Sequence, residues 1–446
     1  MLAILERIIF FVALVVFSAL LGFLISQYQV FPYALIVSSK IYVDDLIIWT
    51  KLRARGDEKE DQVHVIPSSF IPATEDNLTD LDAVSDGFTF MARFWDGRFE
   101  LTLVDTDGTV VHSWQVPEAV YEAAGAHILP LERGQYEIMG SHMYPNGEVL
   151  FIISYRVMAK LDRCSNLQWI FQDSPHHDLE VLEDGRIWVA TRKVRETEHS
   201  ATKTYYDDQL SLLSSDGKLL EQFSLFDAFM DSDYRGVILA GSSAYPSVAG
   251  LDVLHLNDVD IIDPSFARHH AFANPGDFLV SLRKPDSIAI IDRDTRRVKW
   301  ALTGAFLRQH DPDALPDGSI IVFDNRTDSS QHNGAKHMVE PQRFGYSRVV
   351  QLDPETQEVL WSFEGSREEP FYTSIQGGQQ QLPNGNVLIS DPEGGRAFEI
   401  EKGSNRKVWE FRNIVDREEG LVWVGRVTDA VRYSRDYPQF LGEPCP

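Results

Sequence analysis

A turn that ends in Asp-Gly or Asn-Gly, in three of four cases after a proline, recurs along this chain, each time between two β-rich runs. Such turns, flanked by alternating apolar residues, indicate β-hairpins. They occur at residues 144–147, 182–185, 315–318 and 382–385. A second group of turns precedes runs that end in an aromatic residue, namely Trp114, Trp169, Phe223, Trp300, Trp361 and Trp409. Two hairpins per repeat amount to four antiparallel strands, which is the unit of a propeller blade.

The count of repeats predicts an all-β fold, a six-bladed β-propeller over residues 86–433. A blade then takes roughly 60 residues, including longer insertions at 226–254, 264–276 and 326–346. The first repeat lacks an inner strand, and the strand-like run 420–427 is left over near the C-terminus. We therefore expect the C-terminal segment to complete the first blade and close the ring. Stacked sandwiches or a solenoid of the same hairpins do not explain why the count stops at six.

The N-terminal region has a different character. Residues 8–25 form an apolar run of about the length that spans a bilayer. No small-x-small cleavage site follows the run, which favours an uncleaved transmembrane signal anchor at 1–31 over a signal peptide. Residues 32–85 read as an amphipathic helix and an acidic linker, and 434–446 as a C-terminal tail. The predicted location is the membrane, with the propeller in the periplasm or outside the cell.

Charge and cysteine content narrow the possible partners. The formal net charge of −26 argues against nucleic acid and anionic membrane surfaces, although solubility alone also accounts for it. Cys164 and Cys445 either form one bridge outside the cytoplasm or remain two free thiols. No Gly-rich nucleotide fingerprint, GxSxG or HExxH motif is present, so no cofactor is expected.

The start of a blade's first strand and the end of its second strand open on the same mouth of a propeller. Eight residues before the hairpin glycines of two repeats stand His177 and His310, and His255 begins the first strand of the interrupted fourth blade. Three consecutive blades thus offer a histidine at one mouth. A single histidine in such a place is usually structural, but three in equivalent places indicate a site.

The ends of the second strands supply further candidates. Seven residues after the corresponding glycines stand Arg192, Arg283 and Asn325, and Asn257 follows His255 closely. Neutral imidazoles suit a divalent metal, a nucleophile for a phosphoryl or sulfuryl centre, or a simple anion site. A neighbouring arginine repels a cation, so the set favours an anionic group with several oxygens over a metal.

The ordered set of motifs resembles the bacterial arylsulfotransferase (arylsulfate sulfotransferase) family. The resemblance rests on His176-His177-Asp178, His255-Leu256-Asn257, Ser281-Leu282-Arg283, Gln309-His310-Asp311 with Asp324-Asn325, and Leu382-Pro383-Asn384-Gly385-Asn386. It implies a six-bladed propeller that moves a sulfuryl group from an aryl sulfate to a phenol without a nucleotide donor (PAPS). It makes His310 the nucleophile that becomes a sulfohistidine.

The same resemblance implies roles for the other candidates. His177, His255 and Arg283 would hold the sulfuryl oxygens and protonate the leaving phenolate. From their places beside the histidines, Asn325, Arg192 and Asn257 are predicted to contact substrate. Many family members carry a separate N-terminal β domain used in dimer contacts, which this chain replaces with an anchor and linker, so the oligomeric state stays open. Two alternatives remain: a catalytically silent propeller that serves as a scaffold or interaction subunit of a membrane complex, and a metal enzyme.

Overall fold

The structure is a computed structural model, and it describes part of the chain. The described residues are 10–11, 13–18, 20, 64–68, 77–125, 136–196, 204–238, 252–327, 345–366, 369–418 and 421–445. The chain divides into two units, residues 1–62 and 63–446, and all that follows concerns the second. Among the described residues, no helix has the length and apolar character needed to cross a membrane. The predicted anchor at 1–31 and amphipathic helix lie almost entirely outside them.

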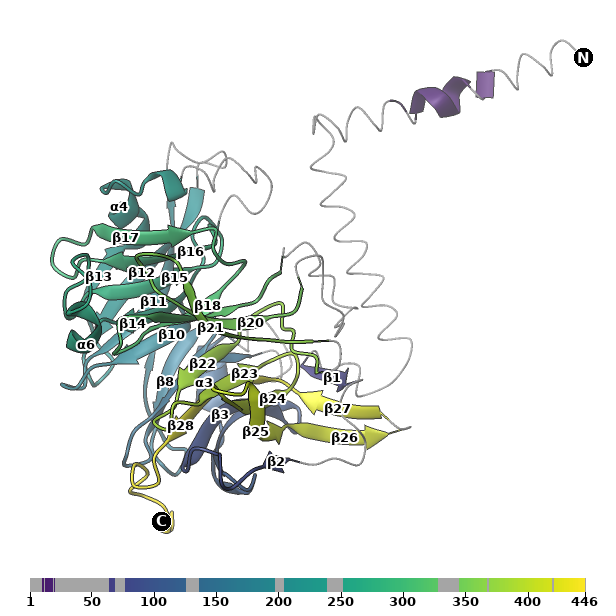
Figure 1. The fold of residues 1–446 in the computed structure, drawn as a ribbon, viewed down its shortest axis with the longest axis vertical. Coiled ribbons are helices and arrows are strands. Elements are labelled where there is room, and N and C mark those ends of the chain that lie inside the picture. Colours follow the sequence, from purple (N-terminus) through teal and green to yellow (C-terminus); the bar gives the residue numbers. More distant parts are fainter. Residues whose placement is uncertain are drawn as a thin grey trace, which may run out of the picture. The chain divides into compact units, whose positions relative to one another are not determined.

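Six antiparallel sheets form the blades, and Figure 1 labels many of their strands. The first blade contains β28 (Val427–Tyr433), β3 (Phe88–Trp95), β4 (Arg98–Asp105) and β5 (Val110–Trp114). The second contains β6 (Ile138–Met143), β7 (Val149–Ile153), β8 (Val157–Leu161) and β9 (Leu167–Phe171). The third contains β10 (Pro175–Val181), β11 (Ile187–Glu196), β12 (Thr204–Leu213) and β13 (Leu219–Ser224).

The remaining blades have the same order from the inner to the outer strand. The fourth contains β14 (Leu256–Ile261), β15 (Phe278–Leu282), β16 (Ser287–Ile291) and β17 (Val298–Thr303). The fifth contains β18 (His310–Ala314), β19 (Ile320–Asp324), β20 (Arg348–Leu352) and β21 (Val359–Glu364). The sixth contains β22 (Gly378–Gln381), β23 (Val387–Asp391), β24 (Arg396–Glu401), β25 (Arg406–Arg412) and, at its outer edge, β2 (Leu78–Thr79). Short helices α3 (Glu118–Ala123), α4 (Leu225–Met230) and α6 (Pro264–Ala267) lie between strands.

The predicted six-bladed propeller is therefore confirmed, and so is its closure by the C-terminal segment. β28 pairs antiparallel with β3, which joins the last part of the chain to the first blade. The inner strands then contact one another in a closed ring: β6, β10, β14, β18, β22, β28 and β6 again.

The spare run at 420–427 does not close the ring, contrary to the prediction. Its residues form β27 (Leu421–Gly425), which pairs with β26 (Ile414–Glu418) and with β1 (Val65–Ser68) in a separate sheet. β1 and β2 both fall within 32–85, the segment predicted to be an amphipathic helix and an acidic linker, so part of that segment pairs with strands of the propeller unit, whose predicted start was residue 86. A strand pattern shows that a segment pairs, but the partner is set by the three-dimensional arrangement.

Apolar side chains fill the space between neighbouring blades. In the described residues, each of the six blade junctions has its own buried cluster, such as Trp188, Val280 and Phe278 between the third and fourth blades. Sheet-on-sheet burial of this kind stabilises a propeller because every blade covers an apolar face of the next. The polar ends of the inner strands are thereby left to line the central channel.

Acidic side chains tie the inner strands of neighbouring blades together. Asp178 of β10 accepts a hydrogen bond from the backbone N–H of Val259 in β14 at 3.1 Å. Asp260 of β14 accepts one from Ala314 in β18 at 3.3 Å, and Asp311 of β18 accepts one from Gln379 in β22 at 2.5 Å. Inner strands of different blades do not share a β-ladder, so these carboxyl groups satisfy backbone donors that would otherwise be unpaired.

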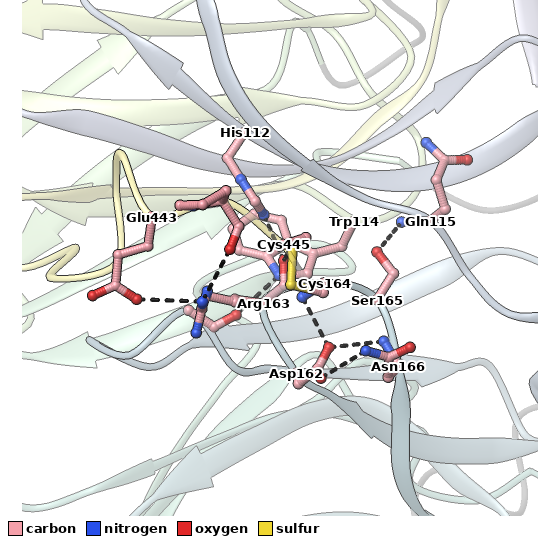
Figure 2. The surroundings of a disulfide bond; sticks show 12 residues. His112, Trp114, Gln115, Asp162, Arg163, Cys164, Ser165, Asn166, Glu443 and Cys445 are labelled. Carbon is pink, nitrogen blue, oxygen red and sulfur yellow. Dashed lines mark hydrogen bonds and ion pairs between the residues drawn. A yellow bond between two sulfur atoms is a disulfide. The ribbon is translucent and has the colours of Figure 1, made fainter.

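The C-terminal tail crosses from the first blade to the second. The Tyr437 hydroxyl donates to the carbonyl of Met143 at 2.8 Å, and Phe440 packs edge-on against the ring of His112. Cys445 then forms a disulfide with Cys164 in the turn between β8 and β9 (Figure 2). Of the two possibilities left open by the sequence, the structure has the bridge.

Candidate active site

The three predicted histidines meet at one mouth of the propeller, on neighbouring inner strands. His177 lies in β10, His255 directly precedes β14, and His310 begins β18. The ring centroids of His177 and His255 are 5.0 Å apart, and the backbone of both residues has a φ of +55°. That left-handed conformation is uncommon outside glycine, and at these two residues it occurs at or near the start of an inner strand.

A cavity of about 90 Å³ lies in the channel between the inner strands. His177, His310 and Asn257 line it together with channel carboxyl groups that include Asp258. The inner strand of the second blade contributes Gly140, where a Cβ atom would stand 2.4 Å from the carbonyl oxygen of His177. Any side chain at that position would displace His177, so the glycine keeps the cavity and the histidine in place.

His310 is oriented by Asn325, which stands one residue beyond the end of β19. Nδ1 of His310 is 2.7 Å from Oδ1 of Asn325, and the amide nitrogen of Asn325 donates to the carbonyls of Thr373 at 3.0 Å and Gln376 at 2.8 Å. These two donated bonds identify the atom facing the histidine as the oxygen. Nδ1 of His310 therefore carries the proton, and Nε2 carries the lone pair.

The protonation state of His310 follows from its surroundings. The side chain is buried. Burial, reinforced by the charge of Arg283, lowers the pKa of His310 to about 3. The imidazole is neutral over the whole physiological range, which is the state that a nitrogen nucleophile needs.

His255 is held by a carboxylate three residues earlier in the chain. Its Nδ1 lies 2.5 Å from Oδ2 of Asp252, so Nδ1–H donates and Nε2 again has the lone pair. Burial lowers the pKa of His255, while Asp252 acts in the opposite direction. A histidine paired with a carboxylate in this way is suited to take up and release a proton.

His177 is oriented by its chain neighbour. Nδ1 of His177 lies 2.9 Å from Nδ1 of His176, and Nε2 of His176 lies 3.5 Å from the carboxylate of Asp208. A proton on Nε2 of His176 faces the negative charge, which leaves its Nδ1 as the acceptor for His177. Burial and the neighbouring histidines lower the pKa of His177 well below the usual range. All three site histidines thus have Nε2 free of the bonds that orient them.

Arg283 stands one residue beyond β15, as predicted from its spacing, and its side chain is buried. Its backbone N–H donates to the carbonyl of His255 at 3.0 Å, which keeps these two residues side by side. Arg308 donates to the Arg283 carbonyl at 2.9 Å. Burial and the charge of Arg308 lower the pKa of Arg283 to about 10, so the guanidinium is charged at neutral pH and attracts anions.

The other predicted substrate contacts lie at different depths. Asn257 lines the cavity, and its amide nitrogen donates to the carbonyl of Gln309 at 2.8 Å. Arg192 lies within β11, which continues to Glu196 instead of ending at the predicted position. Its guanidinium donates to Asp208 and to Asp252. Both carboxylates are residues that support the histidines.

Sequence reasoning missed these supporting residues. Asp252 and Asp208 were not singled out, and His176 was noted only as part of a motif. Asp208 is the direct β-ladder partner of Arg192 across β11 and β12, and Asp252 precedes His255 by three residues. Both spacings were visible in the chain, but nothing marked them among its 67 acidic residues. Across the described ranges, no group of three or more His, Cys, Asp or Glu side chains is arranged to hold a metal ion.

Solved structures with a similar chain path share little sequence with this protein. A protein of unknown function from Bacteroides caccae is 13% identical, with 78% of this chain and 98% of that chain covered and a TM-score of 0.47. A streptogramin B lyase is 10% identical, with 82% and 96% covered and a TM-score of 0.39. Virginiamycin B lyase from Staphylococcus aureus is 8% identical, with 78% and 88% covered and a TM-score of 0.38. No curated protein matches this sequence.

A family comparison is more informative. The sequence profile described as Arylsulfotransferase (ASST) matches residues 141–414, which include all three histidines, Arg283 and Asn325. The matched segment covers more than half of the 446 residues and runs from the second blade to the end of the sixth. The chain belongs to the arylsulfotransferase family.

Proposed function

We propose that this protein is a nucleotide-independent (PAPS-independent) sulfotransferase that moves a sulfuryl group from an aryl sulfate to a phenolic acceptor through a sulfohistidine at His310. Membership of the family supports an aryl sulfate donor and a phenol acceptor. The observation that carries the assignment of His310 is its hydrogen bond to Asn325, which leaves Nε2 of a neutral imidazole free to attack. No nucleotide or metal is needed for this step, because the donor already contains an activated sulfuryl group.

In the first half-reaction, Nε2 of His310 attacks sulfur and the bond between sulfur and the donor's aryl oxygen breaks. The electron pair of that bond leaves with the phenolate. Arg283 offers a fixed pair of N–H donors for the sulfuryl oxygens, where negative charge is concentrated. The anionic donor favours the protonated form of His255, which gives its proton to the leaving phenolate.

In the second half-reaction, neutral His255 removes the proton of the acceptor phenol. The acceptor oxygen attacks sulfur, the bond from sulfur to Nε2 of His310 breaks, and the imidazole regains its lone pair. His255 then holds the proton that the next leaving phenolate requires. Atoms and charge balance over one cycle, and the donor and acceptor phenols exchange one sulfuryl group for one proton.

We infer further that the propeller acts outside the cytoplasm, anchored by the apolar run at 8–25. The disulfide between Cys164 and Cys445 supports this location, because such bonds form and persist in oxidising compartments. The proposal includes subunits of a membrane complex as partners of this protein. Fractionation of cells that express the protein tests the membrane anchor, and thiol labelling before and after reduction tests the disulfide.

The nucleophile is tested by intact-mass measurement after brief exposure to nitrophenyl sulfate. We expect the wild type to gain the mass of one SO₃ group, mapped by fragmentation to His310. We expect His310→Asn to gain none and to lose transfer by more than about 1000-fold. His269→Asn, a change at an exposed histidine, is the control and should behave as wild type.

Two outcomes contradict the proposal in different ways. An adduct on another residue, or turnover that survives His310→Asn, removes His310 as the nucleophile. A wild-type protein that neither gains mass nor turns over any member of a panel of aryl sulfates points instead to the silent scaffold.

A further inference from the structure

A continuous chain of buried and partly buried polar contacts connects two of the site histidines. It runs from His255 through Asp252, Arg192, Asp208 and His176 to His177. We propose that Arg192 is a positioning residue at the centre of this chain, which couples His255 and His177 into one acid-base unit for sulfuryl transfer. The inference rests on the proposed function and assigns Arg192 to the unit in place of substrate contact.

The geometry around Arg192 is bridging. Nε donates to Oδ1 of Asp208 at 2.8 Å, and Nη2 donates to Oδ1 of Asp252 at 3.0 Å. Each carboxylate uses its other oxygen for another partner. Oδ2 of Asp252 accepts from His255 at 2.5 Å, and Oδ2 of Asp208 accepts from the backbone N–H of Leu256 at 2.9 Å. One guanidinium thus fixes the two carboxylates that set the histidine tautomers.

Two aromatic rings hold the guanidinium in its plane. Its carbon lies 4.7 Å from the ring centroid of Tyr155 and 5.0 Å from that of Tyr206. Tyr155 also stacks on His176 at 5.1 Å. Only 11% of the Arg192 side chain is exposed. Its Nε and Nη2 donors point at the two carboxylates, and not at bulk solvent or at a ligand in the mouth. Cation–π contacts with desolvated rings add to the preference for arginine here.

Charge explains why the unit suits proton storage. The carboxylates of Asp208 and Asp252 both contact the guanidinium of Arg192, and both stay ionised. Burial opposes the charge of Asp208, but Arg192 and His176 lower its pKa. Burial opposes that of Asp252 too, but His255 and Arg192 lower its pKa. The two carboxylates and one guanidinium leave one net negative charge, which can stabilise one imidazolium. The enzyme must hold one proton between the half-reactions, and one imidazolium carries it.

Changes at Arg192 and at Asp252 should shift the acid limb of the pH profile for transfer to phenol in opposite directions. The groups that face His255 are Asp252, Arg283 and Arg192, together with the rings of His177 and His310. Asp252 raises the pKa of His255 and Arg192 lowers it. Arg192→Gln should therefore move the limb to higher pH, and Asp252→Asn should move it to lower pH. A merely structural role would not move the two in opposite directions.

The experiment separates the two half-reactions of the full chain. We expect Arg192→Gln to form sulfo-His310 from nitrophenyl sulfate at nearly the wild-type rate, because its leaving phenolate needs little acid assistance. Transfer from sulfo-His310 to unsubstituted phenol should slow by about 10- to 100-fold, which is less than the full contribution of about 10²- to 10⁴-fold from a general base, because His255 itself is retained. Arg192→Lys, which keeps the charge but reaches only one carboxylate, should recover part of the loss.

Arg195→Gln is the matched control, since Arg195 stands on the same strand and also pairs with two carboxylates, those of Asp207 and Asp227, through Nη1. It should leave both half-reactions and the pH profile unchanged. Nitrogen-15 NMR of the histidines supplies a readout independent of turnover: the Nδ1–H tautomer of His255 and His177 should be lost in Arg192→Gln and retained in Arg195→Gln.

Wild-type tautomers and pH limbs in both Arg192→Gln and Asp252→Asn would overturn the inference. If Arg192→Gln does not fold, Arg192→Lys takes its place, and wild-type histidine tautomers together with a wild-type rate of transfer to phenol in that variant would overturn the inference. A wild-type protein that forms no sulfo-His310 instead defeats the proposed function, while the NMR result continues to judge the coupling. The two failures are therefore distinguishable.

Discussion

At the scale of single residues, one amide decides which nitrogen of His310 faces the cavity. The side-chain amide of Asn325 could face His310 with either its oxygen or its nitrogen, so the two side chains alone do not decide which nitrogen of the imidazole carries the proton. The two carbonyls of Thr373 and Gln376 take the amide hydrogens and leave the oxygen for His310. The reactivity of the nucleophile thus depends on backbone atoms that lie 48 and 51 residues beyond Asn325 in the chain.

Asn325→Asp tests this dependence with almost no change in shape. A carboxylate at this place stabilises the imidazolium and raises the pKa of His310 from its present value of about 3. Activity requires the neutral form, so the acid limb of the rate should move to higher pH. We expect at least about a 10-fold loss at pH 6, with partial recovery at pH 9.

The control for this change is Asn146→Asp in an exposed hairpin turn at the opposite end of the blades. Its pH profile should match the wild type. An unshifted profile in Asn325→Asp would show that the amide does not govern His310.

At the scale of elements, the inner strands combine two periodic features. Histidines occupy the mouth, and rows of acidic residues follow them down the channel in β10, β14 and β18. The acidic rows form hydrogen bonds between blades, yet they bring many carboxyl groups into one buried space. Burial raises the pKa of Asp260 and Asp429 to about 6 and that of Asp178 to about 7.

Glu180 of β10 extends this effect to the alkaline side. Burial, with Asp260 and Asp178 nearby, raises its pKa to about 8. The folded state then binds a proton more tightly than the unfolded chain does. The stabilisation that this proton gives is complete below the pKa of the glutamate in the unfolded chain, and it is lost as the pH rises through the folded-state pKa of about 8. We expect the melting temperature of the wild type to fall between pH 5 and pH 9.

Glu180→Gln removes this contribution, so its melting temperature should exceed that of the wild type at pH 9 and converge with it at pH 5. Thermal unfolding over this pH range measures the difference. Glu183→Gln, in the exposed turn that follows β10, should track the wild type throughout. Equal curves for the wild type and Glu180→Gln would contradict the proposed charge crowding.

Much of this element pattern was predictable. Turn residues and strand alternation located the hairpins, and counting from hairpin glycines placed His310, Arg283 and Asn325 at strand ends. The count failed at Arg192 because β11 and β12 pair over ten residues and extend beyond the usual blade. Strand length depends on how long a partner remains available, which the local sequence of β11 does not encode.

At the scale of the whole molecule, two closures hold the ring. β28 pairs with β3 and joins the last strand to the first blade. The tail then continues to the second blade and ends in the disulfide between Cys445 and Cys164 (Figure 2). A bond between residues 281 positions apart restricts the unfolded chain strongly, since the entropy of loop closure grows with the length of the loop.

Removal of the bridge should therefore lower stability without changing the site. For Cys445→Ser we expect a loss of about 2 to 5 kcal/mol in the free energy of unfolding, with an intact sulfohistidine adduct. Denaturant unfolding of oxidised, reduced and variant protein provides the measurement. Reductant should lower the stability of the wild type and leave that of Cys445→Ser unchanged, and equal stability of all samples would refute the role of the bridge.

The sequence by itself determined the repeat, the number of blades and the three histidines, because hairpin turns and strand alternation are local properties. It also located Arg283 and Asn325, whose positions follow from fixed distances along a hairpin. Only the tertiary structure decided what supports them. Asp252, Asp208, Arg192 and His176 come from separate strands and loops, and they act together because blade packing buries them in one place. Buried charges need partners of opposite charge, and which residues become partners depends on distances in the folded structure that the local sequence does not determine.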